Sequence, residues 1–209
     1  GEGEGEGEGE GEGEGERSGQ SVSLSSNGNV VAIGARYNDG NGSNSGHVRI
    51  YNYNGSSWTQ LGQDIDGEFA ADNSGWSVSI SSDGNTVAIG APSNNGNGTR
   101  SGHVRVYNWS GTSWTQVGND IDGEAAEDYS GSSVSISSDG NTVAIGAPYN
   151  AGNGNSSGHV RIYNYNGSSW TQIGNDIDGE TVNDVSGYSV SLSSNGNTVA
   201  IGAPDNDDS

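Results

Sequence analysis

The chain repeats itself every 56 residues, and this period restricts its possible folds more than any other feature of the sequence. The segment at residues 21–29 returns at residues 77, 133 and 189, and no insertion interrupts the spacing. A period of this length is typical of solenoids, propellers and other arrays in which each unit packs on the next. We therefore divide the chain into a Gly-Glu tail and four repeats, the last of them partial: residues 1–16, 17–72, 73–128, 129–184 and 185–209.

Each complete repeat contains four short stretches with β-strand character. Their residues alternate in polarity or are rich in β-branched side chains, and turn residues separate them. Asp83-Gly84-Asn85 is a strong signal for a tight hairpin turn. No stretch has a helical periodicity. In the second repeat the four expected strands are residues 77–81, 86–90, 103–107 and 114–117.

Four antiparallel strands in about 50 residues correspond to one blade of a β-propeller. Ala88 and Gly90 place small residues on one face of a middle strand, so neighbouring blades can pack closely. The 38 Gly and the net charge of −21 are typical of disordered chains, but the regular spacing of the apolar residues favours a folded array. We predict an all-β, β-propeller-like array of four-stranded antiparallel blades, with about three and a half blades in this chain.

Charge and composition exclude several classes of function. The six basic residues are all Arg and are outnumbered by 27 acidic residues, so the overall field would repel nucleic acid. No window approaches the roughly 18 apolar residues of a membrane span, and the chain has no Cys for disulfides or thiolate chemistry. The chain begins with Gly1 and shows no signal peptide, so we expect a processed or partial product.

Two motifs carry a family resemblance. Ser-Gly-Trp-Ser-Val-Ser-Ile at residues 74–80 and Val-Ala-Ile-Gly-Ala-Pro at residues 87–92 resemble the FG-GAP repeat of integrin-α-type β-propellers, in the variant with a Trp-x-Gln-x-Gly strand. The resemblance covers residues 17–209, and Gly-Ala-Pro closes the second strand in three of the four repeats. It implies an extracellular or surface-exposed propeller used for binding or assembly, without catalysis.

The sequence departs from the family pattern at several positions. Ser replaces the Phe of the family motif in all four repeats, and Arg36 replaces the first Pro. The family's calcium loop, an insertion between the first two strands, is reduced here to Asp83-Gly84-Asn85. Calcium at the family's own position is therefore not supported by these residues.

A different acidic pattern recurs after the fourth expected strand. Four acids stand at relative positions 1, 3, 5 and 9 of each run. Calcium takes about six to eight oxygen ligands, and acids at alternate positions of a loop can wrap around one ion. We predict calcium binding by these acids, with a solvated acidic loop as the alternative. The candidate ligands are Asp64, Asp66, Glu68, Asp72, Asp120, Asp122, Glu124, Asp128, Asp176, Asp178, Glu180 and Asp184.

Three histidines occupy one position of the repeat, each followed two residues later by an arginine. Repeat symmetry places the histidines on different blades, so we expect each to begin a strand and to bond to loops or to a neighbouring blade. The arginines are expected to pair with the acidic surface. No asymmetric set of acid, base and nucleophile is present, so we expect no enzyme activity. These residues are His47, His103, His159, Arg49, Arg105 and Arg161.

Six N-glycosylation sequons fall in the expected loops, which permits glycan attachment if the protein is secreted. Asn54 and Asn166, in Asn-Gly-Ser turns, are the first candidates. Aromatic residues around the third strand could stack on sugar rings in a lectin, although blade packing is the alternative that we favour. The candidate glycan acceptors are Asn41, Asn54, Asn97, Asn108, Asn155 and Asn166.

Three and a half blades leave a ring incomplete, because propellers close with at least about four. The Gly-Glu tail, a second chain or further repeats could complete it. The tail is open to three interpretations: a solvated acidic segment, an ordered strand with Gly on one face and Glu on the other, or a placeholder for unread side chains. We favour strand addition between chains at the edge near residues 198–203, which would give a fibre or a two-chain ring.

The function that these patterns favour is an extracellular structural or assembly protein, such as a glycosylated filament subunit built from propeller repeats. The alternative is a cell-surface adhesion or glycan-binding propeller. Self-association, glycans and surface proteins are the expected partners.

Overall fold

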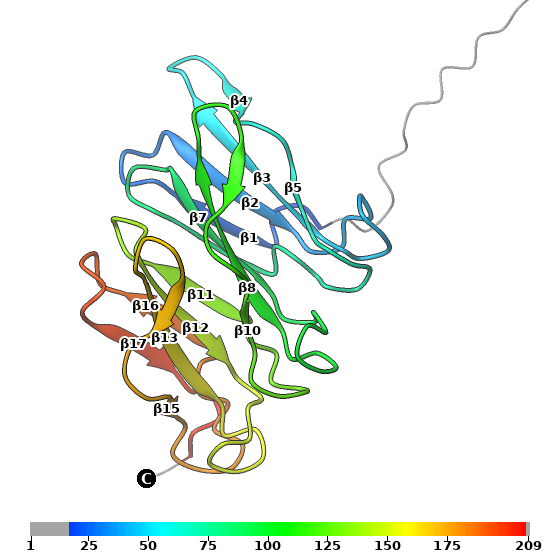
Figure 1. Ribbon diagram of the computed structural model, residues 1–209, viewed down its shortest axis with the longest axis vertical. Coiled ribbons are helices and arrows are strands. Elements are labelled where there is room, and N and C mark those ends of the chain that lie inside the picture. The colour runs from blue at the N-terminus through cyan, green and yellow to red at the C-terminus, as the bar shows by residue number, and fades with distance from the viewer. Residues whose placement is uncertain (1–16, 208–209) are drawn as a thin grey trace, which may run out of the picture.

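The computed structural model describes residues 17–207, which form β-strands and connecting loops without any helix. The strands make three five-stranded sheets and one two-stranded sheet, and each sheet is one blade. Successive blades follow one another in chain order along the molecule (Figure 1). The predicted all-β array of about three and a half blades is confirmed. The Gly-Glu tail at residues 1–16 lies outside the described residues, so its three interpretations stay open.

The strands of blade 1 are β1 (Ser21–Leu24), β2 (Val30–Ala35), β3 (His47–Tyr53), β4 (Trp58–Gln60) and β5 (Ile65–Asp66). Blade 2 has β6 (Ser77–Ile80), β7 (Thr86–Ala91), β8 (His103–Trp109), β9 (Trp114–Gln116) and β10 (Ile121–Asp122). Blade 3 has β11 (Ser133–Ile136), β12 (Thr142–Ala147), β13 (His159–Tyr165), β14 (Trp170–Gln172) and β15 (Ile177–Asp178). Blade 4 has β16 (Ser189–Leu192) and β17 (Val199–Gly202).

Within a blade the first three strands pair antiparallel in chain order, and the fourth position is divided between two strands. In blade 2, β9 pairs with the end of β8 at Trp109, and β10 pairs with its start at His103. The interruption lets Asn119 and Asp120 leave the sheet before Ile121 returns to it. The sequence predicts the first piece of this outer strand and misses the second.

The predicted hairpin turn is present between β6 and β7. Asp83 accepts hydrogen bonds from the Ser81 hydroxyl (2.6 Å) and from the Asn85 amide (2.9 Å). Gly84 has a φ of 77°, which glycine adopts without steric cost. The turn also touches the preceding blade, because a side chain at Gly84 would meet Val30.

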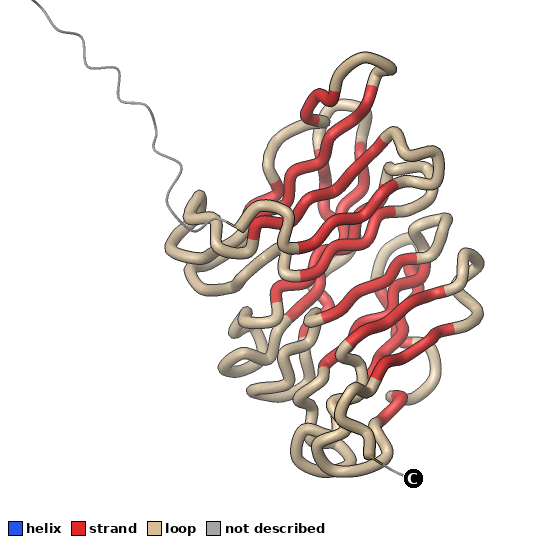
Figure 2. Tube along the Cα trace, turned by 180° about the vertical axis from the view of Figure 1, so that it is seen from behind, coloured by secondary structure: helices blue, strands red, loops and turns tan. Residues whose placement is uncertain are grey.

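Neighbouring blades pack through their first strands and through a shared apolar core. The strands β1, β6, β11 and β16 contact one another in that order, and Figure 2 shows the strands of successive blades stacked with loops at both ends. Serine hydroxyls link these strands by hydrogen bonds. The Ser23 hydroxyl accepts a hydrogen bond from the Ile80 amide (3.1 Å), and the Ser79 hydroxyl accepts one from the Ile136 amide (3.0 Å). The sheet faces between these contacts are closed by Val and Ile side chains.

The two faces of the second strand in a blade differ in side-chain size. Val87 and Ile89 of β7 face blade 1, whereas Ala88 belongs to the core shared with blade 3. A Cβ at Gly90 would collide with the Gly131 carbonyl of the next repeat. The expectation that small residues on this face permit close packing is confirmed, and the apolar core of the protein therefore lies between blades.

Candidate functional site

Each histidine begins the third strand of its blade and is almost fully buried. His103 pairs with Ala91 of β7 on one side and with Asp122 of β10 on the other, so both neighbouring strands fix its backbone. Its ring points out of the sheet toward blade 1. His47 and His159 occupy the same register in β3 and β13.

A cluster of acid and imidazole groups forms where blade 1 meets blade 2. The Nδ1 atom of His103 lies 3.5 Å from an oxygen of Asp120 and 3.9 Å from an oxygen of Glu68. Asp120 belongs to blade 2, whereas Glu68 arrives on the loop that leaves blade 1 after β5. One ligand atom of each residue lies within 4.8 Å of the other two.

The same junction recurs between blades 2 and 3. The Nδ1 atom of His159 lies 3.8 Å from Asp176 and 3.9 Å from Glu124. We call the sets Glu68, His103, Asp120 and Glu124, His159, Asp176 the junction clusters. The sequence analysis predicts the four acids as calcium ligands and gives the two histidines a structural role at the start of a strand, so it does not bring the six residues together.

An arginine stands beside each cluster. An Nη1 atom of Arg105 lies 3.6 Å from Glu68, and its Nη2 atom donates to the Asp66 carbonyl at 2.7 Å. Arg161 makes the same contacts with Glu124 and with the Asp122 carbonyl. The expected pairing of these arginines with acids is therefore present, and it crosses the blade junction.

Burial sets the protonation of the imidazoles. Desolvation, reinforced by the nearby Arg105 charge, lowers the pKa of His103 to about 4, although Asp120 acts in the opposite direction. Burial likewise lowers the pKa of His159, with Arg161 as the next cause. Both rings are neutral at pH 7, so their short distances to carboxylates are not ion pairs. Burial also raises the pKa of Glu68 and of Glu124.

The neutral rings leave one nitrogen without a partner. The Nδ1 atoms of His103 and His159 are buried and make no hydrogen bond. An unsatisfied buried polar atom costs on the order of 1–3 kcal/mol. Such an atom directed at two carboxylates is the kind of arrangement that a bound cation would satisfy.

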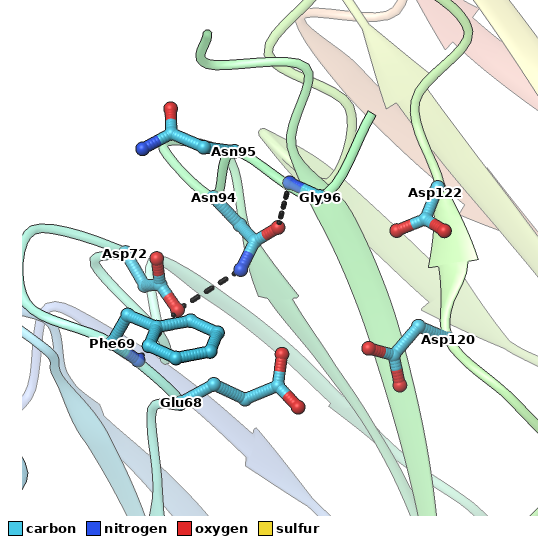
Figure 3. A pocket seen from close by; sticks show the side chains of 8 residues that line it. All are labelled: Glu68, Phe69, Asp72, Asn94, Asn95, Gly96, Asp120 and Asp122. Atoms are coloured by element: carbon cyan, nitrogen blue, oxygen red, sulfur yellow. Dashed lines mark hydrogen bonds between the residues drawn. The ribbon is translucent and has the colours of Figure 1, made fainter. Parts of the chain in front are cut away.

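A pocket of about 380 Å³ opens beside the first junction cluster. Figure 3 shows Glu68 and Asp120 reaching toward the same space from two blades, with Asp122 beside them. The lining is acidic but also contains an aromatic ring and amide groups: Glu68, Phe69, Asp72, Asn94, Asn95, Gly96, Asp120 and Asp122.

The structure gives different surroundings to the four acids of each predicted calcium run. Asp64, at the first position, accepts hydrogen bonds from the Arg49 guanidinium at 3.0 Å and from the Gln60 side-chain amide at 2.5 Å. The second acid ends the short outer strand, as Asp66 does in β5. The third acid, such as Glu68, extends its side chain to the histidine and the arginine of the next blade.

The fourth acid holds its own loop and a loop of the next repeat by hydrogen bonds. Asp72 is buried and accepts one hydrogen bond from the Phe69 amide and one from the Asn94 side-chain amide, each at 3.0 Å. The pocket therefore combines Glu68 and Asp72 of one run with acids of the next run. These acids and histidines could hold a metal, and calcium at the twelve acids stays a prediction.

All six predicted glycan acceptors are exposed. The side-chain amide of Asn41 donates to two carbonyls, at 2.8 and 2.9 Å, and Asn97 repeats this with 2.9 Å to each of two carbonyls. A glycan on either nitrogen would remove at least one of those bonds, because a glycosylated amide nitrogen keeps a single hydrogen. Asn54 and Asn166 hold the turn with their side-chain oxygens, and their side-chain nitrogens donate only to hydroxyl groups, at 3.2–3.4 Å, so they remain the preferred predicted positions. Intact mass compared with the 21.2 kDa polypeptide would check this.

The two ends of the array expose positions that are buried inside it. Val22 of β1 is 63% exposed, whereas its equivalent Val78 is 8% exposed. Trp58 is 47% exposed, against 4% for Trp114. At the other end, Ile177 is exposed although its equivalents in blades 1 and 2 are buried. Each end thus presents one half of a blade junction.

Comparisons with known proteins agree with this architecture. A family model described as FG-GAP repeat matches residues 11–51, 65–107 and 120–163. No curated protein sequence matches the chain. No helix within residues 17–207 is long and apolar enough to span a membrane.

Two solved structures show similar folds. The hydrazine synthase of Kuenenia stuttgartiensis aligns over 86% of this chain with a TM-score of 0.54 and 13% identity. Saccharomyces cerevisiae Sqt1 aligns over 83% with a TM-score of 0.53 and 16% identity. The chain spans only 40% and 39% of the length of these two proteins, respectively. Identities this low support a shared fold and nothing about activity.

Proposed function

This chain belongs to the FG-GAP repeat family, and on that premise we propose that it is an extracellular or cell-surface module for assembly and adhesion. Its open ends are completed by a second copy of the chain, joined head to tail. Repeated joining gives a filament, and joining of two copies gives a ring. The observation that carries the proposal is that the inner strands at the two open ends, β17 and β1, present the two halves of the junction already present between its blades.

The internal junctions define what each half must supply. The indole nitrogen of Trp114 donates to the Leu61 carbonyl of the preceding blade at 2.7 Å. Trp170 donates to the Val117 carbonyl at the same distance. The Trp114 ring also packs on Gly62, and the Trp170 ring packs on Gly118. Each junction therefore uses one tryptophan from the later blade and one carbonyl-glycine pair from the earlier blade.

The open ends present the same two groups. Trp58 is exposed on blade 1, where an earlier blade would receive its indole. Ile173 and Gly174 stand at the matching position of blade 3, and a Cβ at Gly174 would meet no atom within 4 Å. Blade 1 of the second copy follows the two-stranded blade 4, so Trp58 of that copy and Gly174 border the outer-strand position that β16 and β17 do not fill.

The apolar side chains of the inner strands match in this register. Inside the array, Val134 and Ile136 pack in one core with Ala88 of the preceding blade. At the ends, Val22 and Leu24 of β1 are exposed, and Ala200 of β17 is exposed. Burial of two such aliphatic side chains contributes roughly 1.5–3 kcal/mol each.

A catalytic role is not part of the proposal. The acid and imidazole groups recur at equivalent junctions instead of forming one singular set, which is how groups with a structural or binding role are distributed. Glycan binding by the aromatic residues is the alternative. Trp114 and Trp170 already donate across junctions, which leaves the Tyr53–Trp58 pair, with ring centroids 5.2 Å apart, as the candidate sugar platform.

Light scattering on the full chain over a range of concentrations tests the assembly. We expect the mean mass to rise above 21.2 kDa with concentration, and Trp58→Ala combined with Leu24→Glu to return the protein to a monomer. Tyr149→Ala is the matched control, because Tyr149 is as exposed as Trp58 but lies in the loop between β12 and β13, where its ring packs against Tyr129. A wild-type protein that stays monomeric at its highest soluble concentration contradicts the proposal, as does assembly that the double variant leaves unchanged.

A further inference from the structure

We propose that each junction cluster binds a divalent metal ion of the class that accepts both imidazole nitrogen and carboxylate oxygen, such as Zn²⁺. The ligands are Glu68, His103 and Asp120 at one junction, and Glu124, His159 and Asp176 at the next. The ion joins two consecutive blades, because the glutamate comes from one and the other two ligands come from the next. The inference concerns internal junctions and does not depend on assembly through the open ends.

The spacing of the ligand atoms suits such an ion. Zinc ligands at about 2.0–2.2 Å lie about 3.3–3.6 Å from one another at tetrahedral angles. The Nδ1 atom of His103 is 3.5 Å from Asp120 and 3.9 Å from Glu68. All three ligand atoms lie within 4.8 Å of one another, so the carboxylates must draw closer together to reach these separations, and Glu68 lies at the end of a flexible side chain. Space for water at the open coordination positions is available in the adjoining pocket of about 380 Å³.

The buried imidazole nitrogen is independent support for a ligand. His103 and His159 are 2% and 1% exposed, and in both the Nδ1 atom has no hydrogen-bond partner. Acidic residues alone are often a solvated surface, but a buried nitrogen aimed at two carboxylates needs a partner.

The local charge also favours a cation. Glu68, Asp72, Asp120 and Asp122 line the pocket, and Arg105 supplies one opposing charge. Arg105 does not replace the ion, since its Nη1 atom reaches only Glu68, at 3.6 Å, and its Nη2 atom is engaged by the Asp66 carbonyl. The Nδ1 atom of His103 therefore remains available as a metal ligand.

The nitrogen ligand sets the choice of ion. Calcium is coordinated by oxygen atoms, whereas imidazole together with carboxylate suits zinc and related transition metals. A calcium ion at the same place would leave His103 Nδ1 without a partner. Zn²⁺ is therefore the probe, and Ca²⁺ is the comparison.

The test is calorimetric titration of Zn²⁺ into tag-free, chelator-treated full chain, together with melting curves. A ligand that binds only the folded state raises its stability, so we expect Zn²⁺ to raise the melting temperature more than Ca²⁺ does. His103→Gln and His159→Gln should each remove one bound zinc ion per chain, and the double variant should remove two. Glu127→Gln is the charge-matched control, because Glu127 lies outside the clusters and pairs with Arg100.

Cobalt provides a readout of the ligands themselves. Co²⁺ bound in place of zinc should give visible absorption bands of a mixed nitrogen-oxygen site, and these should be lost in the histidine double variant. If that variant fails to fold, Glu68→Gln with Glu124→Gln serves instead and should weaken zinc binding at least tenfold. The proposal is overturned by a titration without heat, by zinc binding that the histidine variants leave unchanged, or by a rise in melting temperature that is equal for Ca²⁺ and Zn²⁺.

Discussion

At the scale of single residues, burial decides what the repeated histidines can do. A histidine in the same sequence setting but exposed would titrate near its usual pKa and form ordinary ion pairs with its acidic neighbours. Here the closed junction keeps the ring neutral in front of Glu68 and Asp120. The chemistry of the site therefore arises from packing between blades and not from the residue types alone.

This burial predicts an acid-sensitive fold in the metal-free protein. The unfolded imidazole of His103 takes up a proton near pH 6.5, whereas the folded one does so near pH 4. Between these values the unfolded state binds more protons, so the free energy of unfolding falls as the pH drops. A shift of this size corresponds to a total loss on the order of 3 kcal/mol for one histidine.

Urea unfolding of the chelator-treated chain between pH 7 and about pH 5 measures the effect, and comparison with a histidine variant separates it from the opposing proton uptake by Glu68 and Glu124, whose pKa burial raises. His103→Gln should flatten the pH dependence, because glutamine does not titrate. A slope that is the same in wild type and variant would show that the ring is not buried in its neutral form.

At the scale of elements, the second strand of each blade depends on a glycine where the next blade approaches. Gly90→Ala would press a methyl group against the Gly131 carbonyl and the Ser77 hydroxyl. Such overpacking costs roughly 1–3 kcal/mol. Gly202→Ala is the matched change in blade 4, where a methyl group would press only on the Ser189 hydroxyl and would meet no backbone of a following repeat.

Urea unfolding of the two variants compares them directly. We expect Gly90→Ala to lower the free energy of unfolding clearly more than Gly202→Ala does. Equal effects would mean that the blades are not packed through these glycines.

The elements also show which parts of the fold could be predicted from the sequence. The 56-residue period, the Asp83-Gly84-Asn85 turn and the alternation around Ile80 are local signals, and they suffice for blades, hairpins and close packing. The short strand β10 could not be predicted, because two residues carry no periodicity. The junction cluster could not be predicted either, since Glu68 and His103 lie 35 positions apart and meet only through the order of the blades.

At the scale of the whole molecule, blade 1 carries two members of a third cluster. His47 and Asp64 lie 3.6 Å apart on blade 1, and Glu180, the equivalent of Glu68, is exposed beyond blade 3. In head-to-tail joining, β16 and β17 stand between blade 3 of one copy and blade 1 of the next, so Glu180 does not reach His47. Glu12 stands one 56-residue period before Glu68 and lies outside the described residues. The metal proposal then predicts that removal of residues 1–16 removes a third zinc ion.

Calorimetric titration of Zn²⁺ into the full chain and into a chain without residues 1–16 measures this. If the tail supplies the acid, truncation removes one zinc ion per chain, and Glu180→Gln, which keeps both internal clusters, changes nothing. The two internal clusters then serve as the reference, because truncation leaves their ligands in place. An equal number of bound zinc ions before and after truncation would show that His47 and Asp64 do not form a third site with an acid of the tail.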